Sequence, residues 1–375
     1  MIPLLAEELA ELPADLRARL DARGFDPAQL EAWGSNLGGD PLERNRLAGK
    51  VEPLPSGALV SPPSPEDRRA GEEALRRGQV ALCVLAGGMA TRMGGVIKAL
   101  LPVARGSSFL ELRLAERAVL GERYGAAPPL WLMTSEPTDG AISQAIGDQA
   151  DVATFEQFVS LRLTSDGSLF RAEDGMPSVY ATGHGDLPEA LNRSGLLRSF
   201  VASGGRYVWL CNIDNLGASI DAALLGQHIA SHEALTVEVV DKYDGDQGGG
   251  PVLHEGTPMI AEHFRLPVGF DPDGVGVFNT NTFIVDAQAL IDLDMAWTYL
   301  EVHKQVGSDS SPQRSAVQFE RLLGEISVGL RPRFARVPRE GAGSRFLPIK
   351  SHDDLAAAEA PLIAMMAARG VVLGS

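Results

Sequence analysis

The sequence has few of the features that mark secreted or membrane proteins. It contains two cysteines, Cys83 and Cys211, in 375 residues, too few for a disulfide framework or a cysteine-based zinc site. The first residues include neither a basic segment nor a long apolar stretch, so no signal peptide is predicted. No apolar run approaches the roughly 18 residues that a membrane-spanning helix needs. These absences indicate a cytoplasmic protein without a membrane partner.

Positive charge is also scarce. The chain has 33 lysines and arginines against 49 aspartates and glutamates, a net charge of −16. Nucleic-acid binding depends on basic side chains that displace counterions from phosphates, so this balance argues against a nucleic-acid partner. A small anionic ligand needs only a few local cations, so the net charge does not exclude one. Hydrophobic residues make up 45% of the chain, which is typical of a folded domain with a buried core.

The amino-terminal part differs in pattern from the rest. Residues 4–33 place apolar and charged side chains at helical spacing and predict short amphipathic helices. Residues 36–64 are rich in proline and glycine and predict an irregular, docked connection. Ser64-Pro65 then has the residue types that cap and open a helix. We therefore expect an amino-terminal segment, residues 1–64, packed on a catalytic domain of residues 65–375.

Strand and helix patterns alternate after residue 79. Val80–Leu85 is apolar throughout, which is typical of a strand buried on both faces. Further strands are expected at 130–133, 206–211 and 235–240, and helices at 109–124, 188–202, 221–232 and 353–368. This alternation predicts an α/β fold with a doubly wound, mostly parallel mixed sheet. In such sheets the ligand binds beyond the carboxyl ends of the strands. We therefore expect the ligand at the loops that follow Leu85, Met133, Cys211 and Val240.

The loop after the first of these strands is rich in glycine. Gly87 and Gly88 allow backbone N–H groups to approach a phosphate or a base, and Arg92 and Lys98 add positive charge. The loop is not a Walker A motif, because Ala99 follows the lysine where that motif has Ser or Thr. The glycine spacing also differs from the dinucleotide fingerprint. On its own, the loop could be an ordinary turn with a surface Arg and Lys.

The glycine loop and a series of later segments together resemble one known family. The loop reads Leu-Ala-Gly-Gly, then Thr-Arg-Met-Gly, a lysine and Leu-Pro. The later segments are Met133–Ser135 with Thr138, Phe155–Gln157, Gly183–Asp186, Asn212–Ala218, Glu238–Lys242, Gly248–Gly249 with Glu262, Phe278–Asn281 and Arg345–Lys350. From Arg69 to Leu355 the chain is similar to the UDP-sugar pyrophosphorylases. That family includes the UDP-glucose, UDP-N-acetylhexosamine and broad-specificity UDP-sugar enzymes.

The resemblance implies a Rossmann-like, GT-A-like nucleotidyltransferase that moves UMP from UTP to a sugar-1-phosphate and releases pyrophosphate. The attacking phosphate oxygen is already an anion, so the reaction needs cations to absorb charge and no general base. By resemblance, Arg92 and Lys98 hold the β- and γ-phosphates of UTP. Lys350 contacts the sugar phosphate and the α-phosphate, and Asp214 holds Mg²⁺, the expected cofactor. Taken alone, Asp214 could form an Asx turn and Lys350 could be a solvated cation.

The resemblance also names residues for substrate binding. Uracil and the adjoining nucleotide are expected at Ala86, Gly87, Gly88, Gln157 and Gly183. His184 contacts the phosphate or ribose, or else it is a packed core histidine. The sugar hydroxyls are expected at Asn212, Gly249, Glu262 and Asn279. Amide and carboxylate groups that are placed for these contacts reject ligands that leave them unpaired.

Several alternatives stay open at this point. Asn212–Ala218 and Arg345–Lys350 favour glucose-1-phosphate, because they are similar to the UDP-glucose enzymes. The glycine loop and Met133–Ser135 are closer to the other branches, so galactose-1-phosphate and N-acetylglucosamine-1-phosphate remain candidates. A nucleotide-sugar-binding homologue without turnover is a further alternative, as is a sugar-transferring enzyme. The residues after Lys350 do not accommodate a carboxyl-terminal β-helix domain, so a monomer or weak dimer is expected.

Overall fold

A mixed sheet of eight strands forms the centre of the molecule. The computed structural model describes residues 5–90, 93–246, 248–307 and 313–373. The strand order is β2-β19-β13-β16-β12-β3-β8-β9, with β16 antiparallel to both of its neighbours and the other pairs parallel. The strands are β2 Leu59–Val60, β3 Val80–Leu85, β8 Leu130–Thr134, β9 Val152–Glu156, β12 Tyr207–Asn212, β13 Leu235–Asp241, β16 Val277–Asp286 and β19 Pro332–Arg336. This arrangement confirms the predicted doubly wound, mostly parallel mixed sheet.

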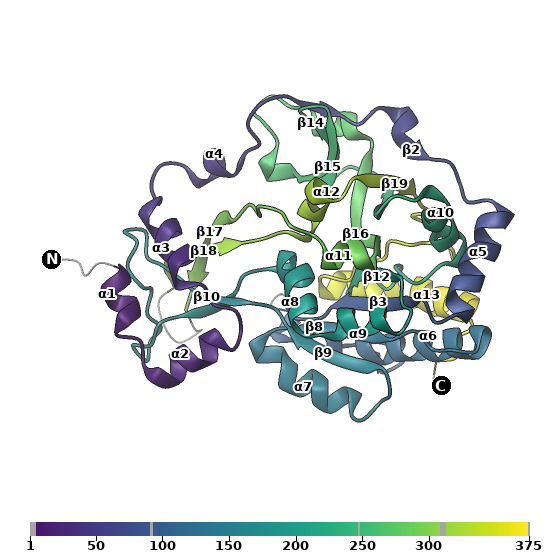
Figure 1. The fold of residues 1–375 in the computed structure, drawn as a ribbon, viewed down its shortest axis with the longest axis horizontal. Helices are drawn as coiled ribbons and strands as arrows, with labels where there is room; N and C mark the ends of the chain where they lie inside the picture. Colours follow the sequence, from purple (N-terminus) through teal and green to yellow (C-terminus); the bar gives the residue numbers. More distant parts are fainter. Residues whose placement is uncertain (1–4, 91–92, 247, 308–312, 374–375) are drawn as a thin grey trace.

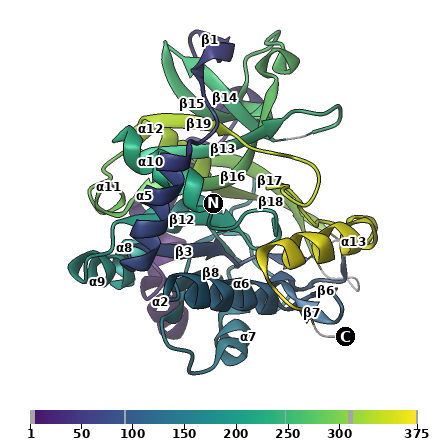
Figure 2. The ribbon, with the colours of Figure 1, turned by 90° about the vertical axis from the view of Figure 1, so that its right-hand side faces the viewer.

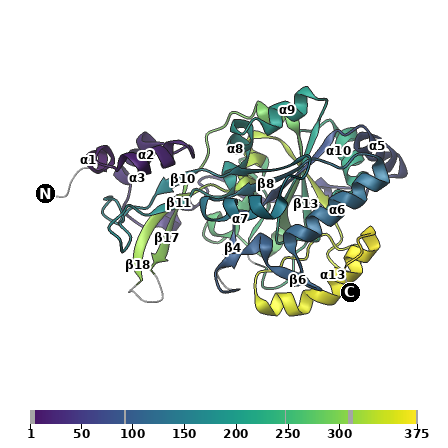
Figure 3. The ribbon, with the colours of Figure 1, turned by 90° about the horizontal axis from the view of Figure 1, so that it is seen from below.

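Helices cover both faces of the sheet and build a hydrophobic core on each. One core includes residues of α5 Pro65–Arg76, α6 Phe109–Tyr124, α7 Glu136–Ile146, α10 Ala222–Ser231 and α13 His352–Arg369. The other includes residues of α8 Leu187–Arg193, α9 Leu196–Ala202, α11 Ala287–Ile291 and α12 Ile326–Gly329. Figure 3 shows α6 and α13 on the side of the sheet opposite to α8 and α9. Figure 2 shows α13 lying beside α6.

Local sequence accounts for several of the helix ends. Ser108 caps α6 through a reciprocal capping box with Glu111, and the left-handed Gly125 ends it. Ser64 caps α5 in the same way. The helix expected over residues 188–202 is wrong in one respect, because the chain breaks into α8 and α9 at Gly195. That glycine has a φ of 80°, a conformation that interrupts a right-handed helix.

The amino-terminal helices belong to a side lobe that lies to the left in Figure 1. We call this the side lobe: α1 Leu5–Ala10, α2 Ala14–Asp21, α3 Pro27–Ser35, β10 Val159–Leu161, β11 Val179–Ala181, β17 Leu300–Val306 and β18 Arg314–Glu320. All of these elements except β17, which pairs with β18, contribute to a separate hydrophobic core that runs from Leu9 to Phe319 in the sequence. Three distant stretches of the chain therefore build one unit. The division of the chain at residue 64 stays a prediction.

The segment expected to be irregular, residues 36–64, contains short regular elements. They are α4 Pro41–Asn45, β1 Val51–Pro53 and β2, and β1 adds a strand to the hairpin of β14 Gly249–His254 and β15 Thr257–Glu262. This hairpin lies at the top of Figure 1. The remaining strands are β4 Met89–Ala90, β5 Val96–Ile97, β6 Pro102–Ala104 and β7 Ser107–Ser108. Within the described residues, no helix is both long and apolar enough to cross a membrane.

Candidate active site

The strand order marks the place where a ligand is expected. Strand β3 lies between β8, which is the next strand of this sheet along the chain, and β12, which pairs with its other edge. After β3 this sheet continues with β8 on one side, and after β12 it continues with β13 on the other side, so the strand order reverses between these two neighbours. Ligands bind beyond the carboxyl ends of the strands at such a point, and we call the space between the loops after β3 and β12 the crevice. Gly87 and Lys98 come from the loop after β3, and Asp214 comes from the loop after β12. The sequence analysis predicted chemistry in both loops.

The glycine loop folds into a small hairpin. Strands β4 and β5 pair, and the N–H of Lys98 donates to the carbonyl of Gly88 at 3.2 Å. A side chain at Gly88 would meet no described atom within 4 Å, so a ligand can approach this backbone. Lys98 thus begins its own short turn directly after the hairpin. Arg92, the other expected phosphate ligand, lies outside the described residues.

Lys98 and Asp214 meet across the crevice. The Lys98 Nζ lies 2.8 Å from Asp214 Oδ2, and their side chains are only 17% and 12% exposed. An ion pair that is shielded from water to this extent interacts more strongly than a surface pair. The pair joins a cation expected to bind phosphate to a carboxylate expected to bind metal. Entry of a polyphosphate with a cation would give each group a new partner.

The loop that carries Lys350 is fastened to the loop that carries Asp214. The N–H of Ile349 donates to the carbonyl of Asp214 at 3.1 Å. The side chain of Asn215 accepts from the N–H of Leu347 at 2.9 Å and donates to the carbonyl of Arg345 at 3.2 Å. Lys350 itself is exposed. These contacts place Lys350 directly after a residue that is hydrogen-bonded to the backbone of Asp214.

A buried ion pair anchors the loop that carries Lys350. The sequence analysis did not predict this pair. Arg345 donates to both carboxylate oxygens of Glu238, from Nε at 2.7 Å and from Nη2 at 2.6 Å. Burial opposes the charge of Arg345, but the contact with Glu238 outweighs it and raises the pKa of the guanidinium. Gly217 lies against the same loop, where a Cβ would approach the carbonyl carbon of Arg345 to 2.5 Å. Arg345 and Glu238 each lie in a motif that the sequence analysis identified, but the motifs do not show that the two side chains meet.

Gln157 and the glycine loop come together at the ends of β3, β8 and β9. Ser135 Oγ donates to the carbonyl of Gly87 at 2.7 Å, and the N–H of Ala86 donates to Met133 at 2.8 Å. A Cβ at Gly87 would lie 3.2 Å from Gln157 Nε2. The Gln157 amide and the backbone of Gly87 are therefore neighbours. Fixed amide donors and acceptors of this kind can recognise the edge of a base.

The segment Gly183–Asp186 wraps around a residue that the sequence did not single out, Arg321. Gly183 has a φ of 104°, and a Cβ there would lie 2.6 Å from the carbonyl oxygen of Arg321. Asp186 is fully buried and accepts from Arg321 Nε at 2.8 Å and from the N–H of Phe158 at 3.0 Å. Gly183 and His184 therefore lie next to the segment of Gln157. Arg321 has no motif around it that could have revealed this role.

His184 is held by the backbone on one side of its ring. Its Nδ1 accepts from the N–H of Leu323 at 2.8 Å. Burial lowers the pKa of His184 from its ordinary value of 6.5. The ring is therefore neutral at neutral pH and its Nε2 carries the hydrogen. Nε2 is therefore left as a hydrogen-bond donor. This geometry is compatible with both interpretations of His184, a ligand contact and a packed core histidine.

Replacing His184 with asparagine should reduce the loss of thermal stability on acidification. The folded state binds this proton less readily than the unfolded state, so the stabilisation is present above the ordinary value of 6.5 and is lost as the pH falls below it. Asparagine keeps an acceptor for Leu323 but does not titrate. Thermal unfolding of both proteins at about pH 7.5 and about pH 5.5 measures the difference. His232→Asn, at the exposed end of α10, serves as control. Equal losses in all three proteins would contradict the prediction.

The residues expected at the sugar lie in two places, Asn212 and Asn279 on β12 and β16, and Gly249 and Glu262 on the β14–β15 hairpin. The chain of β16 bulges between the partners of Glu238 and Val239, so Asn281 leaves the ladder with a φ of 55°. Its side chain donates to Asn212 Oδ1 at 2.8 Å, and its N–H donates to Asn279 Oδ1 at 3.0 Å. Asn281 is thus hydrogen-bonded to both Asn212 and Asn279 because of the bulge. The sequence analysis did not include Asn281 among the sugar-binding residues.

Glu262 and Gly249 face each other in the β14–β15 hairpin. They are paired in register, and a Cβ at Gly249 would lie 2.9 Å from Glu262 Oε1. Burial raises the pKa of Glu262, and the charge of Lys350 opposes this shift. Lys350 and Glu262 therefore interact electrostatically. A cavity of about 730 Å³ adjoins Glu262 and is also lined by Arg46, Gly248, residues 263–264 and residues 266–270.

The side chains at the crevice suit a metal ion that is bound mainly by the phosphates of the substrate. Within the part of the chain that the structure describes, no three His, Cys, Asp or Glu side chains gather as a metal site. Asp214 is the carboxylate that pairs with Lys98 at the crevice. Magnesium is commonly bound by one or two carboxylates together with substrate phosphates. Asp214 fits that manner of binding.

Comparison with known proteins agrees with these motifs. The profile of the family described as UTP–glucose-1-phosphate uridylyltransferase matches residues 45–371. The barley protein named UTP–glucose-1-phosphate uridylyltransferase is 29% identical over 353 residues, covering 85% of this chain and 72% of its own length.

Two solved structures from Trypanosoma brucei have the same fold. The one described as a UDP-glucose phosphorylase is 22% identical, with a TM-score of 0.70, and the match covers 91% of this chain and 77% of the other. The one described as a UDP-N-acetylglucosamine pyrophosphorylase is 20% identical, with a TM-score of 0.69, covering 90% and 78%. Their strand and helix arrangement is thus shared across two sugar specificities.

Proposed function

The chain belongs to the UTP–glucose-1-phosphate uridylyltransferase family, and on that premise we propose that it transfers UMP from UTP to glucose-1-phosphate. The products are UDP-glucose and pyrophosphate. One observation carries the proposal: Lys98, Asp214 and Lys350, far apart in the sequence, are brought to one crevice beyond β3 and β12. A crevice with two lysines and one carboxylate is suited to joining two phosphate anions.

The residues act by positioning and by charge. A phosphate oxygen of glucose-1-phosphate attacks the α-phosphorus of UTP, and the bond from that phosphorus to the β-phosphate oxygen breaks. Pyrophosphate leaves with the bonding electron pair, and no proton transfer is needed. We propose that Lys350 contacts the sugar phosphate and the α-phosphate, and that Lys98 exchanges its ion pair with Asp214 for the departing phosphates. Both lysines neutralise charge that would otherwise keep the two anions apart.

Asp214 would hold the Mg²⁺ that the proposal requires. When bound, the ion neutralises phosphate charge and fixes the orientation of the phosphates. The carboxylate is held in place because the backbone of Asp214 and the side chain of Asn215 are fastened to residues 345–349. Arg92 is proposed as a further phosphate ligand on the resemblance alone.

The two ends of the crevice are assigned to the two substrates. Ala86, Gly87, Gln157 and Gly183 are proposed to bind uracil, with Gly88 and His184 beside the phosphates or ribose. Asn212, Gly249, Glu262 and Asn279 are proposed to bind the sugar. The cavity of about 730 Å³ beside Glu262 favours a second candidate substrate with a larger sugar, N-acetylglucosamine-1-phosphate.

The test is pyrophosphate release with Mg²⁺ over a grid of nucleoside triphosphates and sugar-1-phosphates. We expect release with UTP and glucose-1-phosphate, and a lower rate with N-acetylglucosamine-1-phosphate. A preference for another nucleotide would overturn the uracil assignment while keeping the reaction class. Absence of release throughout, with UTP still bound in calorimetry, would favour a homologue that binds without turnover.

A further inference from the structure

Two arginines from outside the crevice hold the segment that contains Gln157. We call Glu156–Val159 the base segment. Arg23, in the turn between α2 and α3, donates from Nε to Glu156 Oε1 at 2.9 Å. Its carbonyl accepts from the N–H of Val159 at 3.3 Å. Arg23 therefore binds the base segment on both sides of Gln157.

Arg23 also reaches the neighbouring strand end. Its Nη1 lies 3.8 Å from Oε1 of Glu136, the residue that follows Ser135. Ser135 in turn donates to the carbonyl of Gly87. Next to Arg23, Gly24 packs so closely on Phe158 that a Cβ there would lie 2.7 Å from the ring. The turn of the amino-terminal helices thus spans the carboxyl ends of β8 and β9.

Arg321 fixes the base segment from the other direction. Its side chain is 2% exposed and pairs with Asp186, whose other carboxylate oxygen accepts from the N–H of Phe158. The guanidinium lies over the rings of Phe158 at 5.5 Å, Trp297 at 5.2 Å and Tyr299 at 5.3 Å. A delocalised cation among aromatic faces has little freedom to move.

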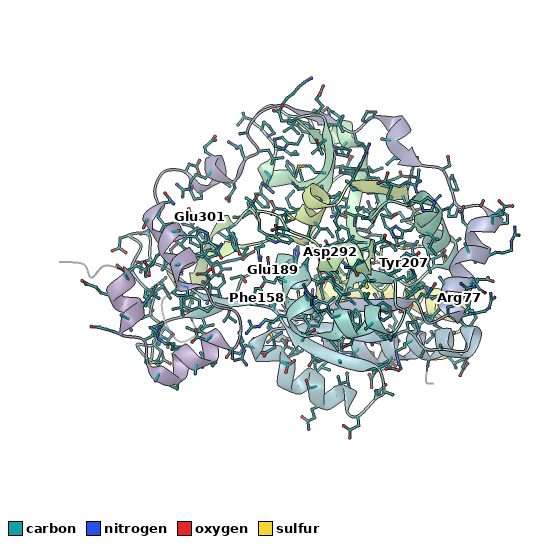
Figure 4. The ribbon with its side chains drawn as sticks, in the orientation of Figure 1. Arg77, Phe158, Glu189, Tyr207, Asp292 and Glu301 are labelled. Atoms are coloured by element: carbon teal, nitrogen blue, oxygen red, sulfur yellow. The ribbon has the colours of Figure 1, made fainter. Side chains whose placement is uncertain are left out.

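The same arginine connects the base segment to the side lobe. Tyr299 contacts Trp33 of α3, with ring centroids 4.3 Å apart. Arg321 also pairs with Glu189 at 3.0 Å. Figure 4 labels Phe158 and Glu189 between the side lobe and the central sheet. A continuous set of contacts therefore runs from the amino-terminal helices to the residue next to Gln157.

We propose that Arg23 and Arg321 are positioning residues for base recognition, and that the amino-terminal helices set the affinity and base selectivity for UTP through them. The inference rests on the proposed function. Recognition by a side-chain amide requires that its position be fixed within a fraction of an ångström. Neither arginine contacts Lys98, Asp214 or Lys350 through any hydrogen bond or ion pair among the described residues. Their loss therefore affects binding of the base more than transfer of the phosphoryl group.

The test compares Arg23→Ala and Arg321→Met with the unmodified protein in steady-state kinetics. We expect the KM for UTP to rise about tenfold, kcat at saturating UTP to change less than about threefold, and the preference for UTP over CTP to fall about tenfold. Calorimetric titration of UTP without sugar phosphate should show the same weakening. Arg321→Lys, which keeps the charge, should restore part of the affinity.

Two matched variants separate positioning from general destabilisation. Arg171→Ala removes an exposed arginine that pairs with Glu8 of α1 at 3.6 Å. Arg162→Met removes a half-buried arginine of the side lobe that donates to Gln318 at 2.9 Å. Both should keep the KM for UTP and the base preference of the unmodified protein.

The outcomes are distinguishable. If the unmodified protein releases no pyrophosphate and binds no UTP, the proposed function fails. If it is active and Arg23→Ala, which involves a partly exposed side chain, leaves KM and base preference unchanged, this inference fails. It also fails if the arginine variants lower kcat alone, or if the two matched variants shift KM equally.

Discussion

Replacing Lys350 with alanine should lower kcat by roughly 10²- to 10³-fold, the usual effect of removing one charge-stabilising donor from a transition state. The KM for UTP should change little, because Lys98 and the base segment remain. Lys350 is exposed and its loop is held by Asn215 and the backbone of Asp214, so the fold should tolerate the change. Steady-state kinetics with glucose-1-phosphate, together with calorimetric binding of UTP, measures both parts of this prediction.

Two further variants define what Lys350 supplies. Lys350→Arg keeps a positive charge but changes its shape, and should retain more turnover than the alanine variant. Lys50→Ala removes an exposed lysine that pairs with Glu52 at 2.9 Å, and should leave kcat unchanged. Turnover of Lys350→Ala within about threefold of the unmodified protein would remove Lys350 from the site.

Asp214→Asn should lower kcat by roughly 10²-fold and raise the Mg²⁺ concentration required for half-maximal rate, because a neutral amide is a poorer magnesium ligand than a carboxylate. The substitution keeps the size of the side chain and the backbone carbonyl that accepts from Ile349. It also frees Lys98 from its partner. Initial rates over a range of Mg²⁺ concentrations at saturating UTP measure the effect.

The comparison for Asp214→Asn is Asp292→Asn, an exposed carboxylate that accepts from Gln288 at 2.9 Å. That variant should show the magnesium dependence of the unmodified protein. A reduced rate of Asp214→Asn without any change in magnesium dependence would contradict metal binding at this residue. The reduction would then be due to the lost ion pair with Lys98.

The sequence predicted those parts of the fold that depend on neighbouring residues. The strand Val80–Leu85 and the helix Phe109–Tyr124 have the predicted bounds, because apolar runs and caps act within a few residues. The side lobe could not be predicted in this way. Its core joins Leu9, Leu161 and Phe319, and no local pattern shows that three such distant stretches meet.

The site shows the same limit. Lys98, Asp214 and Lys350 were predicted because they lie in recognisable motifs, and the structure brings them together. Arg321 and Arg23 lie outside any motif, and only their long-range partners Asp186 and Glu156 reveal them. The role of Asn281 depends on a bulge in β16, which a sequence pattern of period two does not show. Buried ion pairs and bulges are properties of the assembled structure.

The attachment of Lys350 to the loop of Asp214 has a consequence for biosynthesis. Residues 345–350 are made long after Lys98, Gln157 and Asp214, so the second lysine is the last of these site residues to be added. Because Arg345 is the buried partner of Glu238, the emerging chain leaves that carboxylate without its counter-ion until this segment arrives. The segment 345–350 therefore adds both the second lysine and the counter-ion of Glu238, and α13 adds its buried side chains to the core afterwards. A nascent chain that lacks this segment is therefore expected to be inactive.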